Sequence, residues 1–353
     1  MFVVFTPGRA MDHASGVRAY RPRLAGFDLL RLVAAGTIFY QHACSLLGRE
    51  DLVEVLGLRV GRVGTATFFA LSGYLAATSS RSPESWLGRR LMKLFPAYWV
   101  VTALTFAATA LTGYKQFDTI QVVCQLAGIG LYTHGEMLVG VSTWFVSALL
   151  VLYLIAYLGL RTEGLAVVVA TLLLGVVAVI DPAGLESFTI VSTHGVTFLL
   201  AYTVGKSGRP AGSRFLFWAL VLAAGGMYWP QFRYGAVALG GLAVVTACTR
   251  DCGFGRWFAT YSYEWFLVHG LCLHVVIALG ADRLALLLPC AAVVSLASAV
   301  LLKGFVETLV ARVNSLAGWQ GNDEDGSRSL ALARSADRAV ASQPRLPHVT
   351  NSW

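Results

Sequence analysis

Residues 27–48 read FDLLRLVAAGTIFYQHACSLLG, an almost unbroken apolar run that closes on a glycine. A helix needs about 20 mostly apolar residues to cross the hydrocarbon core of a bilayer, and this run is long enough. Its ionisable side chains nevertheless include Arg31 and His42. Because such groups are costly inside a bilayer and are kept mainly where they act, the run predicts a membrane helix that carries part of a functional site.

The composition of the whole chain agrees with a membrane protein. Of its 353 residues, 56% are hydrophobic and only 13% are charged, whereas a soluble domain has about 25% charged residues. This balance excludes a soluble enzyme and a disordered chain. The net charge of +8 would suggest a nucleic-acid partner in a soluble protein. Here we expect membrane lipids and no nucleic acid, since the basic residues gather on one side of the predicted spans.

Ten apolar runs are long enough to cross a bilayer: 27–47, 62–80, 94–113, 143–161, 164–181, 188–206, 213–229, 232–249, 257–279 and 284–303. An eleventh run, 119–134, is shorter and contains two glutamines and a histidine, so we interpret it as a re-entrant or interfacial segment. The predicted fold is therefore all-α, a polytopic membrane helix bundle of about ten transmembrane helices plus this segment.

The basic residues predict the orientation of the bundle, because cytoplasmic loops are enriched in Lys and Arg. Ten spans with both termini in the cytoplasm keep the basic loop 206–214 inside, and a full crossing by 119–134 would turn it outward. The chain then divides into a cytoplasmic N-terminal segment (1–26), a membrane domain (27–305) and a polar tail (314–353) that we expect to be a disordered cytoplasmic extension.

Two histidines are predicted to reach the same depth in the membrane. His42 lies eleven residues after Arg31 in the first span, and His269 lies twelve residues into a later span that starts near Trp257. At the helical rise His42 lies about 16 Å deeper than Arg31, and His269 lies about 18 Å deeper than Trp257. Glu264 lies five residues before His269 and needs a partner, for which the shallow arginines, Arg31 among them, are candidates.

A third group of residues follows the second span. The sequence FFALSGYL (68–75) places Ser72 and a glycine in an apolar run, where another helix or a ligand can approach the backbone closely. Arg89, Arg90 and Lys93 follow within five residues, and on a helix the last two share a face. Such a cluster suits phosphate groups. Each of these groups also has a purely structural explanation. His42 could be a histidine packed against a neighbouring helix, and Glu264 could form an ion pair between two helices. The basic cluster could be ordinary positive-inside anchoring.

Taken together, these pieces resemble the acyltransferase type 3 family of bacterial integral-membrane O-acyltransferases. The matching stretches are Arg31 with His42, FFALSGYL (68–75), RRLMKLFPAYW (89–99), WFVSALLVLYLIAY (144–157) and SYEWFLVH (262–269). The resemblance implies a ten-span membrane fold in the bacterial inner membrane. It also implies transfer of an acyl group, usually acetyl from acetyl-CoA, to a hydroxyl of a cell-surface or lipid-linked glycan.

The resemblance further implies residue roles. His42 would be catalytic, Arg31 would belong to the donor site, and Arg89, Arg90 and Lys93 would contact the coenzyme. To these we add His269 and Glu264 as catalytic candidates and Ser72 as a donor-site candidate. Lys93 stands where the family commonly has a second arginine, and Leu149 stands where many members have a glutamate.

Two other classes of function remain open from the sequence. A transporter or flippase for a glycan precursor would also need buried charges, and an inactive family member could act as a scaffold in polysaccharide assembly. The chain carries no P-loop, dinucleotide fingerprint or paired Cys-x-x-Cys pattern, so we expect no metal and no cofactor beyond the acyl-CoA substrate.

Overall fold

The structure, a computed structural model, describes residues 25–79, 82–112, 117–134, 143–180, 186–207, 211–246 and 253–316. Within these ranges the fold is all-α apart from one minimal hairpin, which confirms the predicted class. The elements are α1 (Ala25–Leu46), η1 (Glu50–Leu52), β1 (Glu54–Val55), β2 (Leu58–Arg59), α2 (Val60–Ala77), α3 (Pro83–Thr112), α4 (Thr119–Leu126), α5 (Gly130–His134), α6 (Thr143–Arg161), α7 (Leu165–Ile180), α8 (Glu186–Lys206), α9 (Ala211–Gly225), α10 (Phe232–Thr246), α11 (Gly253–Ala278) and α12 (Leu284–Leu316).

Each of the ten predicted apolar runs coincides with one helix. By length and hydropathy, three of the helices in the described ranges qualify as membrane spans, namely α3, α6 and α12 over Pro83–Leu111, Thr143–Arg161 and Leu284–Val313. Three further apolar helices, α7, α9 and α10, are shorter. The number of spans, the inner membrane and the placement of the termini therefore stay predictions.

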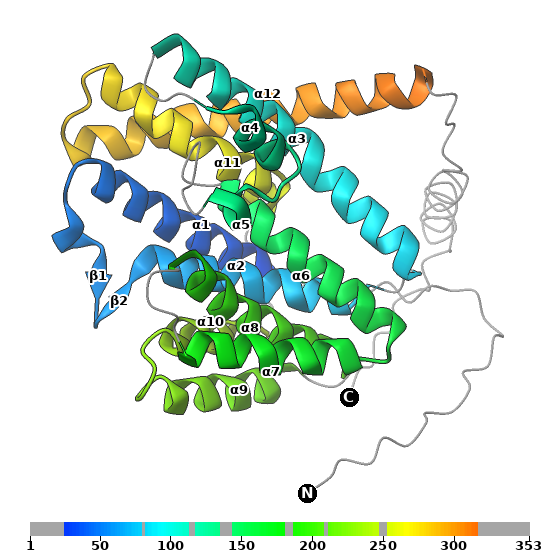
Figure 1. Cartoon of the computed structure of the whole chain (residues 1–353). Coiled ribbons are helices and arrows are strands. Elements are labelled where there is room, and N and C mark those ends of the chain that lie inside the picture. The colour runs from blue at the N-terminus through cyan, green and yellow to red at the C-terminus, as the bar shows by residue number, and fades with distance from the viewer. Residues whose placement is uncertain are drawn as a thin grey trace, which may run out of the picture.

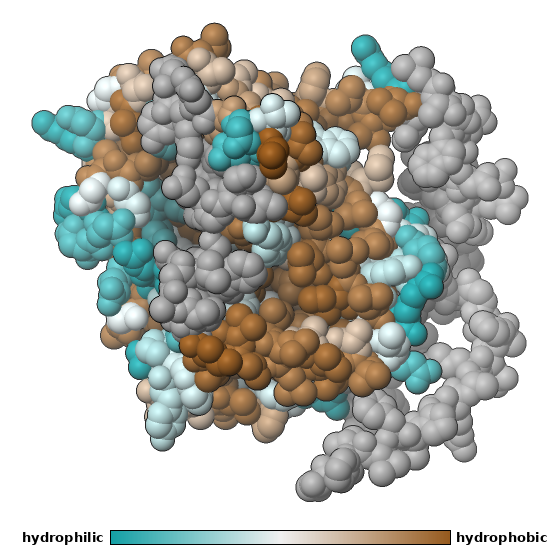
Figure 2. Space-filling view, in the orientation of Figure 1, coloured by the Kyte–Doolittle hydropathy of each residue, from teal (hydrophilic) through white to brown (hydrophobic). Residues whose placement is uncertain are grey.

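The surface of the bundle exposes a wide apolar area, as a protein embedded in a membrane requires. Figure 2 shows brown, hydrophobic residues across the middle of the visible face and teal, hydrophilic residues gathered toward its left and right edges. Large apolar side chains such as Leu165, Leu172 and Leu173 on α7 are exposed. A soluble protein rarely leaves such wide apolar surface uncovered.

The segment 119–134 breaks into two short helices. Asp118 caps α4, because its carboxylate accepts a hydrogen bond from the Gln121 amide (2.7 Å) while the Gln121 side chain accepts one from the Asp118 amide (3.3 Å). A turn at Gly128, with φ of +76°, separates α4 from α5. Neither helix is long enough to cross a bilayer, which agrees with a re-entrant or interfacial segment.

The basic motif belongs to one long helix, and the predicted helix start is wrong here. We expected Pro96 in the first turn of a span beginning near 94, but α3 begins at Pro83, and Pro96 lies in its interior. Proline is well tolerated at the first position of a helix because its missing N–H has no partner there. Pro83 takes that position, and the polar motif is therefore helical throughout.

The chain folds around the first two helices. In Figure 1, α1 and α2 lie between the pair α11–α12 and the group formed by α7, α8, α9 and α10. α2 packs against α1 and α8, and α1 packs against α11. The histidine of α1 and the FFALSGYL stretch of α2 are thus placed at the centre of the bundle.

The crossing of α2 and α8 depends on Gly73. A Cβ atom at this position would overlap the backbone carbonyl group of Phe198 on α8, so the two helices can approach this closely only without a side chain. This confirms that the Ser72–Gly73 step admits a neighbouring helix. Small residues commonly allow such approaches in membrane bundles.

Replacing Gly73 with alanine is expected to lower the stability of the protein. The added methyl group must displace a helix backbone, which typically costs about 1–3 kcal/mol. Thermal unfolding in detergent should therefore show a lower melting temperature for Gly73→Ala. Gly88→Ala is the matched control, because a Cβ atom there meets open space on α3. Equal melting temperatures for the two variants would show that the α2–α8 contact is not limiting.

Candidate active site

The two histidines predicted at equal depth meet in the structure. His42 on α1 and His269 on α11 lie with Nδ1 of His42 2.8 Å from Nε2 of His269. The two rings are almost parallel, with an interplanar angle of 4°. The contact follows from the packing of α1 on α11 and from the similar number of helical turns before each histidine.

The hydrogen bonds around His269 decide which ring nitrogens carry protons. Nδ1 of His269 lies 2.6 Å from the carbonyl oxygen of Phe266, which can only accept, so Nδ1 donates. In the neutral ring Nε2 must then accept, and the donor is Nδ1 of His42. This order leaves Nε2 of His42 as the nitrogen with a lone pair.

The surroundings separate the two histidines by access. His269 is fully buried, and its ring stacks on Trp265 at 5.3 Å and 13°. Phe39 and Phe266 close other sides of the same ring, at 6.3 and 5.5 Å. His42 is only half-buried. His42 is therefore the more accessible of the two rings, and His269 is positioned to act through it.

Arg90 is held at the other end of the site, nearer the start of α3. Its guanidinium carbon lies 5.8 Å from the centre of the Trp86 ring and 5.7 Å from that of Tyr153. One of its amino groups donates a hydrogen bond to the carbonyl oxygen of Leu75 on α2 at 3.4 Å. These contacts fix the side chain in one orientation, which suits charge-assisted binding of an anion.

Tyr153 on α6 joins the donor-site candidates to one another, and the sequence analysis did not identify it. It interacts with the side chains of Ser72 and Arg31, and the Arg90 guanidinium lies over its ring. Its ring is buried beside Trp86. A tyrosine in the apolar stretch 144–157 is expected to pack in the core, so its position in the sequence did not indicate a functional role.

Lys93 lies among other charged groups at the same end. The charges that act on it come from Arg90, Arg31, Glu264 and Lys303 on α12. The structure thus brings four cations and Glu264 together from α1, α3, α11 and α12, and Lys303 also forms an ion pair with Glu307 at 3.1 Å. We name this group the cation cluster: Arg31, Arg90, Lys93, Lys303 and Glu264. Lys303 was missed as a site residue because it is the last residue of the last predicted span, where a lysine is expected to act as a membrane anchor.

Arg31, a candidate partner of Glu264 from the sequence, is not its main partner in the structure. The cations that act most strongly on Glu264 are Lys303 and Lys93. Arg31 instead lies 3.9 Å from Asp28, one turn earlier on α1. Which cation acts on Glu264 depends on how α11 packs against α12, and residue spacing within one helix does not determine that packing.

Arg89 is separate from the cation cluster. It is exposed on α3, whereas the neighbouring Arg90 turns toward α2 and α6. Successive helical residues are rotated by about 100° from one another, so the two arginines face different surroundings. Across the described residues, no group of three or more His, Cys, Asp or Glu side chains is arranged to hold a metal ion.

Comparison with known proteins adds one finding. Residues 24–304 match a family model described as acyltransferase domain, the type 3 acyltransferases. The match spans well over half of the 353 residues and includes the histidine pair and the whole cation cluster. No curated protein and no solved structure matches the chain at a significant level.

Proposed function

Since this chain belongs to the acyltransferase domain family and is a membrane acyltransferase, we propose that it transfers an acetyl group from acetyl-CoA to a hydroxyl of a cell-surface or lipid-linked glycan. The observation that carries the proposal is the hydrogen-bonded chain from Nδ1 of His42 through His269 to the Phe266 carbonyl. Acyl transfer to an alcohol needs a base beside the hydroxyl, and this chain supplies one.

In the proposed reaction, Nε2 of His42 accepts the proton of the acceptor hydroxyl as its oxygen attacks the thioester carbonyl carbon. The new C–O bond forms, and the C–S bond breaks when the tetrahedral intermediate collapses. The proton then passes from His42 to the departing sulfur of coenzyme A. His269 holds the tautomer of His42 and shares the positive charge that develops on the pair.

We place the phosphate groups of the donor at the cation cluster. Arg31 precedes His42 by eleven residues on α1, which is a rise of about 16 Å, and Glu264 precedes His269 by five residues on α11. Both helices therefore run from the cluster toward the histidines. An extended donor bound with its phosphates at the cluster would direct its thioester along these helices.

We further propose that the cluster faces the cytoplasm of a bacterial cell, where acyl-CoA is found, and that the acceptor arrives from the opposite side. In that arrangement the acetyl group crosses the membrane without passage of acetyl-CoA. The basic loops that predict both termini in the cytoplasm support this orientation.

The test is an assay of the purified full chain with acetyl-CoA and a set of glycan acceptors. Release of free coenzyme A, with acetyl label on the acceptor, supports the enzyme. A transporter or an inactive scaffold would leave the thioester intact. Comparing the masses of surface glycans from wild-type and deletion cells would then identify the acceptor by the loss of one acetyl group.

Replacing Arg90 with alanine is expected to weaken donor binding more than it slows the chemical step. The Michaelis constant for acetyl-CoA should rise about 10- to 100-fold, the effect of losing one hydrogen-bonded charge contact. Arg90→Lys should give an intermediate value, because lysine keeps the charge but loses the planar fork. Arg256→Ala, in the first turn of α11, is the matched control. If the Michaelis constant for acetyl-CoA were unchanged in a folded Arg90→Ala variant, Arg90 would only anchor the protein in the membrane.

A further inference from the structure

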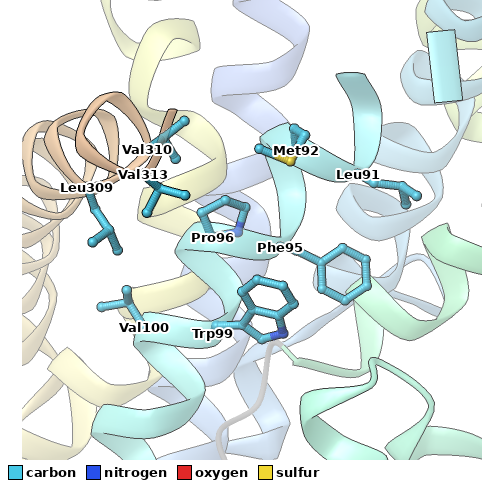
Figure 3. Close-up of a pocket in the computed structure, with 9 residues that line it drawn as sticks. All are labelled: Leu91, Met92, Phe95, Pro96, Trp99, Val100, Leu309, Val310 and Val313. Atoms are coloured by element: carbon cyan, nitrogen blue, oxygen red, sulfur yellow. The ribbon is translucent and has the colours of Figure 1, made fainter. Parts of the chain in front are cut away.

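An apolar groove runs between α3 and α12 on the outside of the bundle. It has a volume of about 430 Å³, within the range of pockets that bind small molecules. Figure 3 shows Leu309, Val310 and Val313 of α12 on one side and Pro96 and Val100 of α3 facing them. The complete lining is Leu91, Met92, Phe95, Pro96, Trp99, Val100, Leu309, Val310 and Val313.

The groove faces the lipid if the chain spans a membrane. Both of its walls belong to helices that are long and apolar enough to cross a bilayer. Met92, Trp99 and Val313 are 52%, 49% and 54% exposed, so its walls are open to the surroundings. No side chain in the lining carries a charge, and hydrocarbon is the chemistry that such a surface accepts without cost.

An exposed arginine precedes the groove-lining residues of α3. Arg89 precedes Met92 by three residues and Pro96 by seven, so it continues the groove-lining stripe of α3 toward the start of that helix. It is exposed and, as shown above, stands apart from the cation cluster. An exposed arginine outside the cation cluster therefore continues the face of α3 that lines the groove.

We infer that this groove binds an anionic phospholipid, with one acyl chain between α3 and α12 and the phosphate group at Arg89. Basic residues at the ends of grooves between membrane helices bind the head groups of anionic lipids. Apolar walls of this kind match an acyl chain, and the charge at Arg89 selects the head group. The site is independent of the proposed reaction, because it uses neither the histidine pair nor the cation cluster.

Trp99 provides a direct measurement, because it lines the groove. The full chain is reconstituted in vesicles of phosphatidylcholine, to which phosphatidylglycerol with brominated acyl chains or phosphatidylcholine with the same chains is added. Bromine quenches only nearby indole rings. The Trp99 signal is the difference between wild-type fluorescence and that of Trp99→Phe. We expect brominated phosphatidylglycerol to quench it at a several-fold lower mole fraction than brominated phosphatidylcholine.

Two variants separate selective binding from general lipid contact. Arg89→Gln should reduce the preference for phosphatidylglycerol about fivefold, the effect of one basic residue near an anionic surface, while Arg256→Gln keeps it. Val313→Phe should reduce quenching by both lipids, because the larger ring fills the groove. Leu301→Phe, a highly exposed site on the same helix, is its control.

Three results would overturn the inference. Equal quenching by the two lipids would show an unselective surface. A preference that survives Arg89→Gln would place the head group elsewhere. If neither lipid quenched Trp99, another segment of this chain or a second copy would cover the groove. None of these readings requires turnover, so they are distinct from a failure of the proposed enzyme activity.

Discussion

Replacing His42 with alanine is expected to lower kcat about 100- to 10,000-fold, the range usual for the loss of a general base. The variant keeps the cation cluster, because no member of the cluster is replaced and Arg31 lies about 16 Å away from His42 along α1. Binding of acetyl-CoA should therefore persist. The measurement is the rate of acetyl transfer at saturating donor, together with the donor dissociation constant from equilibrium dialysis.

The control for this variant is another buried histidine of the same bundle. His194 on α8 is 3% exposed and stacks on Phe69 at 5.4 Å, away from the His42–His269 pair. His194→Ala removes a ring of the same size from the interior without touching the proposed base. Comparable losses in both variants would point to a packing effect. Normal turnover in His42→Ala would remove the proposed mechanism altogether.

The sequence was sufficient to predict the equal depth of the two histidines, because depth along a helix is a local quantity, whereas their contact depends on the packing of α1 on α11. Each residue adds a fixed rise of 1.5 Å, so eleven and twelve residues from the same membrane face give nearly the same level. The helices themselves were predictable for a similar reason. Apolar runs of sufficient length, such as 27–47 and 143–161, are continuous in the sequence and coincide with α1 and α6.

Other parts of the site depend on how helices rotate against one another, which spacing within one helix does not determine. Lys303 acts on Glu264 more strongly than Arg31 does, because α11 packs on α12. Arg89 and Arg90 are adjacent in sequence but face different surroundings. Tyr153 becomes part of the donor site only because α6 brings it beside Arg90 and Ser72.

The predicted number of spans raises a related physical question. α9 and α10 each have 15 residues, a length of about 22 Å, whereas the hydrocarbon core is about 30 Å thick. Helices this short can cross only where the bilayer thins or where flanking residues extend to the interface. If all ten helices cross, we expect the membrane to be thinner beside α9 and α10 than beside α3 and α12.

Replacing His269 with leucine is expected to lower kcat about 100-fold while the Michaelis constant for acetyl-CoA changes little. Leucine removes the acceptor for Nδ1–H of His42, so the ring loses the bond that fixes its tautomer and orientation. It also leaves the Phe266 carbonyl without the imidazole donor. The loss is smaller than in His42→Ala because the base itself remains.

The conservative variant His269→Gln distinguishes this positioning role from simple packing. The glutamine oxygen can accept from Nδ1 of His42, and its amide group can donate to the Phe266 carbonyl, so both hydrogen bonds can form again. We therefore expect His269→Gln to recover much of the turnover lost in His269→Leu, with equal melting temperatures for the two variants. If leucine and glutamine were equally active, the hydrogen bond between the rings would have no part in catalysis. His42 would then act as a base without a positioning partner.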